Sequence, residues 1–297
     1  MSAFPSIEQY QQSANYAQIG EYKIAYWTAQ DETAAKSEAP WIVMIHGFPS
    51  AAWDWHGQWK TLRKDYRLLS FDLLGFGLSD KPHVHNYSLL EQADVIEALL
   101  GQLGIKQCHI LCHDYGDSVA QELLTRHFDK LTSVDIQSFC YLNGGLFADY
   151  HRPLLTQKLL KSPIGPFIAR FMSQRSLQQS FSKIFGPNSQ PKASHIEVLY
   201  GLLEHKHGRR VLPRLLTYID ERKIHNLRWI NAMQHTQVAQ CFINGVHDPI
   251  SGQHMLTQFN TLLPEATTHA LDVGHYPQLE APKKVTALYQ AFVCVNS

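Results

Sequence analysis

Short apolar runs rich in β-forming residues alternate with helical patterns along most of this chain, and this alternation constrains the fold more than any other feature. Buried strands are predicted at residues 41–47, 66–72, 107–113, 134–143, 237–245 and 267–274. Strands that alternate with helices form a mainly parallel, twisted sheet with helices on both faces. The sequence therefore predicts an α/β fold.

Two of the predicted helices carry clear signatures. The first covers 88–103, where Ser88 and Glu91 form a capping-box pattern and Gly104 marks the end. The second follows Pro282 near the end of the chain. Each has an apolar stripe at helical spacing, which is typical of a helix packed on a core: Leu89, Ala93, Ile96, Leu100 and Leu103 in the first, and Val285, Leu288 and Phe292 in the second.

The region from about 144 to 233 breaks the alternation. It contains helical patterns interrupted by Pro and Gly, with many apolar residues and no good strand. We predict that residues 144–233 form a helical cap inserted after the sixth strand, and that 1–143 and 234–297 form the core domain.

Composition limits the class of partner. Lys plus Arg and Asp plus Glu number 26 each, so the net charge is zero, which argues against a nucleic-acid partner. No secretory signal pattern is visible in residues 1–20, and no apolar stretch reaches membrane-spanning length, so we expect no membrane partner. The five cysteines follow no regular framework, which favours free thiols and a cytoplasmic location.

The stretch "CHDYG" at 112–116 matches a nucleophile elbow, in which small flanking residues lift a nucleophile out of a tight strand-to-helix turn. The central residue is Asp114, preceded by an apolar strand pattern and followed by a helical one. An Asp that merely caps a helix is the simpler interpretation.

Three further segments favour a catalytic site over that interpretation. His46 and Gly47 end an early strand and offer backbone N–H groups for an oxyanion hole, although the segment also fits an ordinary turn. Asp248 follows a later strand, where an Asp-Pro turn is the alternative, and His275 follows the last strand. The order nucleophile, acid, His is the order that one hydrolase fold uses.

A metal site is not predicted. In the stretch "CHILCH", at 108–113, the cysteines face the opposite side of a strand from the histidines, so the four side chains cannot converge on one ion. The expected reaction therefore uses no metal and no other cofactor.

Taken together, "HGFP", "DLLGFGLSDKP", "CHDYG", "HDP" and "GHYPQLEAP" resemble the α/β-hydrolase superfamily, in its epoxide hydrolase and haloalkane dehalogenase branch. A carboxylate nucleophile attacks saturated carbon and leaves an alkyl–enzyme ester. The resemblance implies that Asp114 is this nucleophile and that His275, oriented by Asp248, activates a water to hydrolyse the ester. Backbone N–H groups of Phe48 and Tyr115 would hold the oxyanion.

Epoxides and haloalkanes need different help for the leaving group. Dehalogenases of this family place N–H donors beside the nucleophile, but here the matching positions are Tyr115 and Phe48. Epoxide hydrolases use cap tyrosines as proton donors, and Tyr218 is the first candidate, ahead of Tyr200 and Tyr141.

We therefore predict hydrolysis of small hydrophobic epoxides. Dehalogenation remains the alternative, with Trp229 as a halide donor, and a low-turnover ligand receptor is the second alternative. Some dehalogenases carry the acid where this chain has Asn143, which cannot hold a negative charge. We expect Asn143 and His46 near the site, Asn143 in a packing or hydrogen-bonding role.

Overall fold

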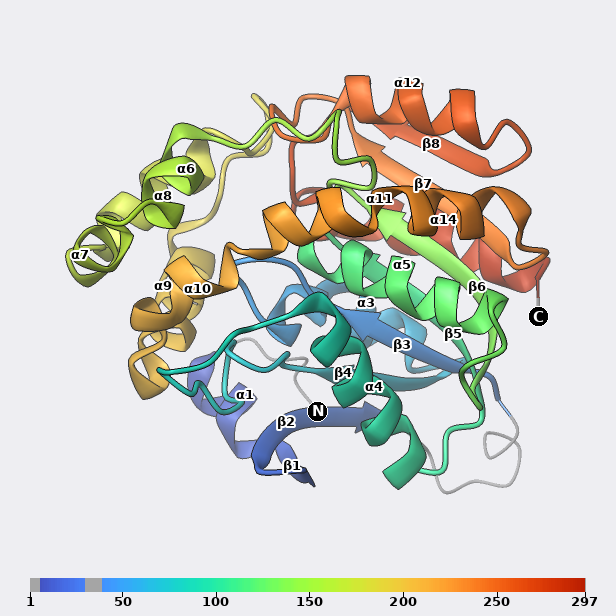
Figure 1. Cartoon of the computed structure of the whole chain (residues 1–297), viewed down its shortest axis with the longest axis horizontal. Coiled ribbons are helices and arrows are strands. Elements are labelled where there is room, and N and C mark those ends of the chain that lie inside the picture. The colour runs from blue at the N-terminus through green and yellow to red at the C-terminus, as the bar shows by residue number, and fades with distance from the viewer. Residues whose placement is uncertain (1–5, 30–38, 297) are drawn as a thin grey trace.

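A single eight-stranded sheet forms the centre of the computed structural model, which describes residues 6–29 and 39–296 (Figure 1). The strand order is β1-β2-β4-β3-β5-β6-β7-β8. Strands β3 to β8 pair in parallel, whereas β2 pairs antiparallel with both β1 and β4. The strands are β1 (Asn15–Ile19), β2 (Tyr22–Ala29), β3 (Trp41–Ile45), β4 (Arg67–Phe71), β5 (Gln107–His113), β6 (Asp135–Leu142), β7 (Ala239–Gly245) and β8 (Thr267–Leu271).

The α/β fold class predicted from the sequence is confirmed, and each of the six predicted strands is present. Their central members are buried on both faces; every residue of β3 is buried, for example. The two N-terminal strands were not predicted. They form the antiparallel edge of the sheet, where β1 is mostly exposed, so their sequences lack the continuous apolar run of a central strand.

Helices cover both faces of the sheet. On one face α4 (Leu89–Gln102) packs against α5 (Tyr115–Phe128), and on the other α3 (His56–Leu62) packs against α14 (Pro282–Cys294) (Figure 1). Two separate clusters of buried apolar side chains fill these two layers. The remaining elements of the core are α1 (Ile7–Gln12), η1 (Ala52–Trp55), α12 (Gln253–Leu262) and α13 (Pro277–Glu280).

The start of α4 differs from the predicted capping box. The Ser88 hydroxyl does cap the helix by accepting from the Leu90 N–H, at 3.2 Å, but the Glu91 carboxylate bonds His85 instead, at 2.7 Å. A second carboxylate comes from far along the chain: Glu221 accepts from the Ser88 hydroxyl at 3.0 Å and from the Leu89 N–H at 2.9 Å. A local pattern could not reveal this partner.

Between β6 and β7 the chain forms helices only. They are α6 (Leu155–Lys161), α7 (Gly165–Arg170), α8 (Gln174–Ser182), α9 (Ala193–Glu204), η2 (His205–Val211), α10 (Leu212–Leu215) and α11 (Tyr218–His235). In Figure 1, α6 to α10 project from one end of the sheet, while α11 runs back along α5. The division of the chain into two domains stays a prediction. Among the described helices, none has the length and apolar character needed to cross a membrane.

Candidate active site

Asp114 lies at the sharp turn between β5 and α5. Its backbone has φ 47° and ψ −102°, a region that residues other than glycine rarely adopt. The turn also needs a glycine two residues later, since a Cβ on Gly116 would lie 2.6 Å from the carbonyl oxygen of Ile45. The local sequence thus builds a strained turn that holds the Asp114 side chain at the carboxyl end of the central strands.

Both carboxylate oxygens of Asp114 have partners, although the side chain is buried. The Phe48 N–H donates to Oδ2 at 3.1 Å, and Nη2 of Arg222 lies 3.4 Å from Oδ1. Burial raises the pKa of Asp114, but the charges of His275 and Arg222 outweigh it and hold the pKa below its ordinary value. The carboxylate is therefore ionised at neutral pH, as a nucleophile must be.

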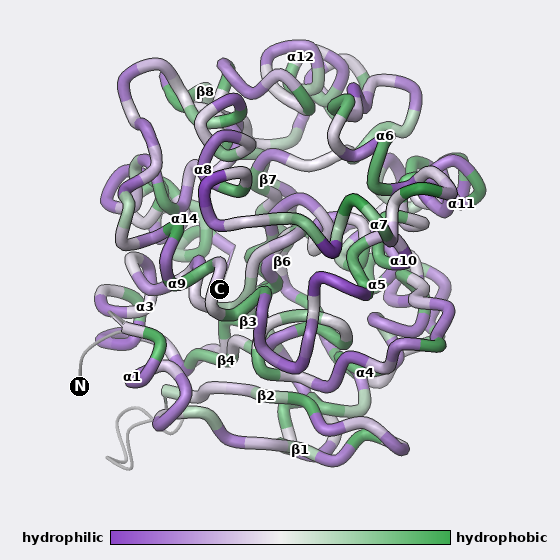
Figure 2. The backbone as a smooth tube through the Cα atoms, turned by 90° about the vertical axis from the view of Figure 1, so that its left-hand side faces the viewer, coloured by the Kyte–Doolittle hydropathy of each residue, from purple (hydrophilic) through white to green (hydrophobic). Residues whose placement is uncertain are grey.

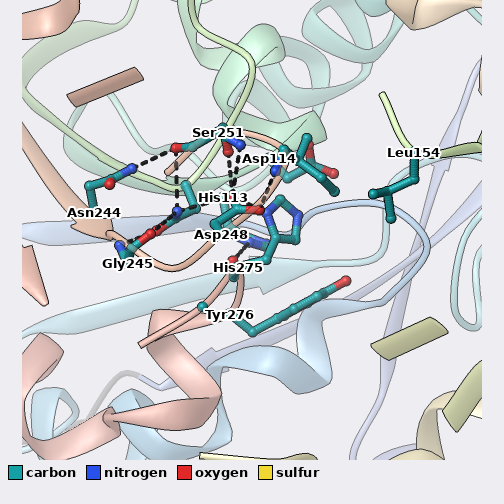
Figure 3. Close-up of polar contacts among 12 residues, drawn as sticks. His113, Asp114, Leu154, Asn244, Gly245, Asp248, Ser251, His275 and Tyr276 are labelled. Carbon is teal, nitrogen blue, oxygen red and sulfur yellow. Dashed lines mark hydrogen bonds and ion pairs between the residues drawn. The ribbon is translucent and has the colours of Figure 1, made fainter. Parts of the chain in front are cut away.

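Asp248 bonds the ring of His275, with 2.7 Å between Oδ2 and Nδ1 (Figure 3). The same oxygen accepts from the Ser251 hydroxyl at 2.7 Å, the Ser251 N–H at 3.0 Å and the Asn143 amide at 3.1 Å, while Oδ1 accepts from the Ile250 N–H at 2.8 Å. Burial raises the pKa of Asp248, but His275 and these donors together lower it to about 2. Asp248 is a fixed negative charge behind the imidazole.

His275 is held by its ring and by its backbone. Its N–H donates to the carbonyl of Ile184 at 2.7 Å, and its own carbonyl accepts from Nε2 of His113 at 2.8 Å. Burial lowers the pKa of His275, but the charge and hydrogen bond of Asp248 and the charge of Asp114 raise it to about 9. With Nδ1 bonded to Asp248, Nε2 is the atom left to exchange a proton.

A cavity of about 670 Å³ opens onto His275. Phe48, Ile250 and His275 line it from the core, and side chains of α6 to α8 line it from the inserted helices. Most of the lining is apolar: Leu154, Leu159, Leu160, Phe167, Ile168, Phe171, Met172, Leu177, Phe181, Ile184 and Leu212 contribute to it. The cavity suits a hydrophobic small molecule.

Tyr218, the first predicted proton donor, lies close to the site but does not line this cavity. Its ring is fully buried, 5.0 Å from the ring of Tyr115 and 4.5 Å from the Arg222 guanidinium. Its hydroxyl makes no hydrogen bond of ordinary geometry with the described residues. Burial and then the charge of Asp114 raise the pKa of Tyr218, while Arg222 lowers it.

The two weaker tyrosine candidates lie elsewhere. The Tyr200 hydroxyl donates to the carbonyl of Met172 at 3.4 Å, on the inserted helices. Tyr141 is buried in the core with its ring 6.1 Å from that of Phe139 and 6.4 Å from that of Phe259. Like Tyr218, neither tyrosine lines the cavity, but Tyr218 differs in that its ring contacts Tyr115 and Arg222 beside Asp114.

Trp229 and His46 also make contacts that keep them away from a substrate. The indole N–H of Trp229 donates to Glu122 at 2.9 Å, so this residue is not available as a halide donor. Both ring nitrogens of His46 bond the backbone, Nδ1 to the Gly47 carbonyl at 2.9 Å and Nε2 to the Leu73 N–H at 3.0 Å. The structure gives His46 a packing role.

The predicted oxyanion donors and Asn143 lie at the site. The Phe48 N–H already contacts an oxygen of Asp114, and Tyr115 begins α5, where an N–H has no acceptor within its own helix. Asn143 bonds Asp248 and also the Gly245 carbonyl, at 2.9 Å, which ties the ends of β6 and β7 together. The amide of Asn143 therefore helps to fix the position of the Asp248 carboxylate.

Arg222 was not predicted. It is 1% exposed, and from α11 its Nε donates to the Ser118 hydroxyl at 2.6 Å while Nη2 donates to the Asp114 carbonyl at 2.9 Å. The available signal was its position four residues after Tyr218, which places both on one helix face. In the sequence it sits in the charged run "DERK", which is typical of a solvated face.

No group of three or more His, Cys, Asp or Glu side chains is placed to hold a metal ion within residues 6–29 and 39–296. In the "CHILCH" strand, His109 bonds the Ser138 hydroxyl at 2.8 Å and the Cys112 thiol contacts the Cys140 carbonyl at 3.4 Å.

Comparison with known proteins gives relatives over almost the whole chain. The chain is 36% identical to the mesoderm-specific transcript protein of Mus musculus over 97% of this chain and 88% of that protein. It is 35% identical to the putative hydrolase LipZ of Mycobacterium tuberculosis, over 83% of this chain and 85% of that protein.

Solved structures share the fold. The haloalkane dehalogenase DatA from Agrobacterium tumefaciens matches with a TM-score of 0.80 at 17% identity, over 96% of this chain and 97% of that chain. The family model for the alpha/beta hydrolase fold matches residues 40–282, which contain the elbow, the acid and the histidine. This chain therefore belongs to the α/β-hydrolase fold family.

Proposed function

We propose that this hydrolase uses Asp114 as a nucleophile and opens small hydrophobic epoxides through a covalent alkyl–enzyme ester. One observation carries the proposal: an ionised carboxylate occupies the strained elbow position, bonded to the Phe48 N–H and close enough to His275 for their charges to couple. A carboxylate at this position displaces a leaving group from saturated carbon, whereas a hydroxyl or thiol would form an acyl-enzyme.

In the first step an oxygen of Asp114 forms a bond to an epoxide carbon, and the carbon–oxygen bond of the ring breaks. The alkoxide takes the proton of the Tyr218 phenol, whose hydroxyl makes no ordinary hydrogen bond with the described residues. The product of this step is a hydroxyalkyl ester of Asp114. Hydrolysis of the ester in the second step leaves one extra proton on the Asp114 carboxyl, and this proton returns through water to the Tyr218 phenolate.

In the second step Nε2 of His275 takes a proton from water, and the hydroxide attacks the ester carbonyl of Asp114. The Phe48 N–H holds the oxyanion, and collapse releases the diol with the proton from His275. Ester formation removes the negative charge of Asp114, which is one cause of the high pKa of His275. Alkylation itself therefore moves His275 toward the neutral form that acts as a base.

The contacts around the nucleophile favour an epoxide over a halide. Phe48 has no side-chain donor, the Tyr115 ring packs against Tyr218, and the Trp229 N–H is engaged by Glu122. A receptor without turnover has no need of an imidazole oriented by a buried acid, so the hydrolytic reaction is the better explanation of the Asp248–His275 pair.

The test is a single turnover in water enriched in heavy oxygen. The first diol should carry light oxygen, and the label should appear in the Asp114 carboxylate. His275→Gln should accumulate the ester as added mass on the peptide that contains Asp114. Label in the first diol would mean direct attack by water. If the protein released bromide from bromoalkanes and did not turn over styrene oxide, the epoxide proposal would be wrong and dehalogenation would take its place.

A further inference from the structure

A patch of large apolar side chains is exposed on α6, α7 and the turns beside them. The patch consists of Leu155, Leu159, Ile164, Phe167 and Phe171, with exposed fractions of 70%, 39%, 57%, 68% and 67%. Figure 2 views the molecule from the side on which these helices project, and hydrophobic stretches lie along α6 and α7. Exposed apolar residues that form a contiguous patch mark an interaction site more often than scattered ones do.

The patch is continuous with the cavity. Leu159, Phe167 and Phe171 are exposed on the outer surface and also line the cavity that reaches His275. A hydrophobic molecule could pass from the surface to the site while keeping apolar contacts. We therefore expect the surface that binds this patch to contain hydrophobic small molecules that can serve as substrates.

The patch lies in a strongly basic segment. Residues 150–196 contain no Asp or Glu and seven basic residues, although the whole chain has equal numbers of both signs. Lys158, Lys161 and Arg170 lie on α6 and α7 themselves. Within the part of the chain that the structure describes, Lys161 is the one member of the seven that pairs with a carboxylate, that of Asp220 at 2.6 Å. The others are Arg152, Arg175, Lys183 and Lys192, together with Lys158 and Arg170.

We propose that the apolar patch docks on the surface of an anionic lipid bilayer, and that hydrophobic substrates enter the cavity from it. Apolar side chains that enter the headgroup region, flanked by Lys and Arg, are the pattern of surface-bound helices. A second copy of this chain would bring two basic segments face to face, which opposes a symmetric dimer through the same patch. The docking extends the proposed function but does not depend on it. It also departs from the expectation of no membrane partner, which considered only spanning segments.

The test uses the full chain with vesicles of phosphatidylglycerol and phosphatidylcholine, separated by sedimentation. Binding to mixed vesicles should exceed binding to pure phosphatidylcholine and should fall when salt is raised from about 0.1 M to about 1 M. The double variant Phe167→Ser with Phe171→Ser should bind at least about tenfold more weakly, because two large apolar side chains are lost from the contact. Lys158→Glu with Arg170→Glu should show a similar loss.

Two matched controls carry the same chemical changes elsewhere. Ile224 and Leu227 are exposed apolar residues on α11, and Lys283 and Lys284 are exposed on α14. Replacing the first pair by Ser or the second by Glu should leave vesicle binding unchanged. Asp114→Asn should abolish turnover but not binding, which separates the two proposals. Equal binding to both kinds of vesicle, equal losses in the controls, or a dimer that the patch variants dissociate in sedimentation velocity would overturn the proposal.

Discussion

The two walls of the cavity are built in opposite ways. On the core wall, His275 lines the cavity, and behind it the Asp248 side chain is held by bonds from Ile250, Ser251, Asn143 and His275. On the wall formed by α6 to α8, apolar side chains both line the cavity and face outward. Directional bonds fix the reacting groups, while non-directional apolar contacts shape the space for substrate. Under the proposed function, the chemistry and the choice of substrate would depend on different regions.

The two regions are joined at the base of the inserted helices. The buried ammonium of Lys81 donates to the carbonyls of Leu202, at 3.1 Å, and His205, at 2.7 Å. Glu221 caps α4, and Ile184 accepts from the His275 N–H. We expect substitutions among the hydrogen-bonded residues of the core wall to reduce overall turnover strongly. Substitutions on the inserted helices should each slow one step of the proposed reaction and leave the other step unchanged.

The largest effect is expected for Asp114→Asn. An amide is a poor nucleophile, so turnover should fall by at least about 10⁴-fold, the scale of losing a nucleophile elsewhere. Steady-state rates with an epoxide measure this, and circular dichroism checks the fold. Full activity in a freshly folded variant would show that the carboxylate is not the reacting group.

Asp248→Asn tests the core wall through the pH dependence of ester hydrolysis. In the proposed second step the base is neutral His275, so ester hydrolysis should rise with pH and level off above the pKa of the imidazole. Asp248 is the strongest of the groups that raise this pKa to about 9. Its removal should move the plateau to lower pH and lower its height by about 10²- to 10⁴-fold, because the ring loses its orientation. An unchanged midpoint in single-turnover ester hydrolysis would count against Asp248.

Tyr218→Phe tests a residue of the inserted helices that is proposed to act only in ester formation. Deleting the hydroxyl should slow ester formation by about a hundredfold, the scale of general acid catalysis, and leave ester hydrolysis unchanged. Tyr200→Phe is the matched control and should behave like the wild type, because its hydroxyl bonds Met172. Equal rates of alkylation in both variants would remove Tyr218 from the mechanism.

The smallest effect on catalysis is expected for Trp229→Phe. The indole bonds Glu122, which also pairs with Arg126 and Arg228, so activity should stay within about twofold. Losing a buried bond to a charged group should lower the free energy of unfolding by about 1–3 kcal/mol, measured with urea. A large loss of activity at unchanged stability would mean that Trp229 contacts the substrate.

Much of the fold was readable from local pattern. Central strands such as 41–45 are continuous apolar runs because both of their faces are covered, and the elbow at Asp114 needs a glycine at Gly116 for a steric reason. The edge strand β1 was not readable, since its exposed face removes that signal. The cap at Ser88 was predicted, but its carboxylate partner was not, because Glu221 lies 133 residues away.

By itself the sequence determined the order of the elements and the chemical types at the ends of the strands, Asp114, Asp248 and His275, because these depend on short-range patterns. Only the tertiary structure decided which cap side chains reach them. Tyr218, Trp229 and Arg222 all lie on α11, yet Arg222 bonds Asp114 while Trp229 turns to Glu122. The rotation of that helix against α5 selects among them, and packing between elements distant in the chain sets this rotation.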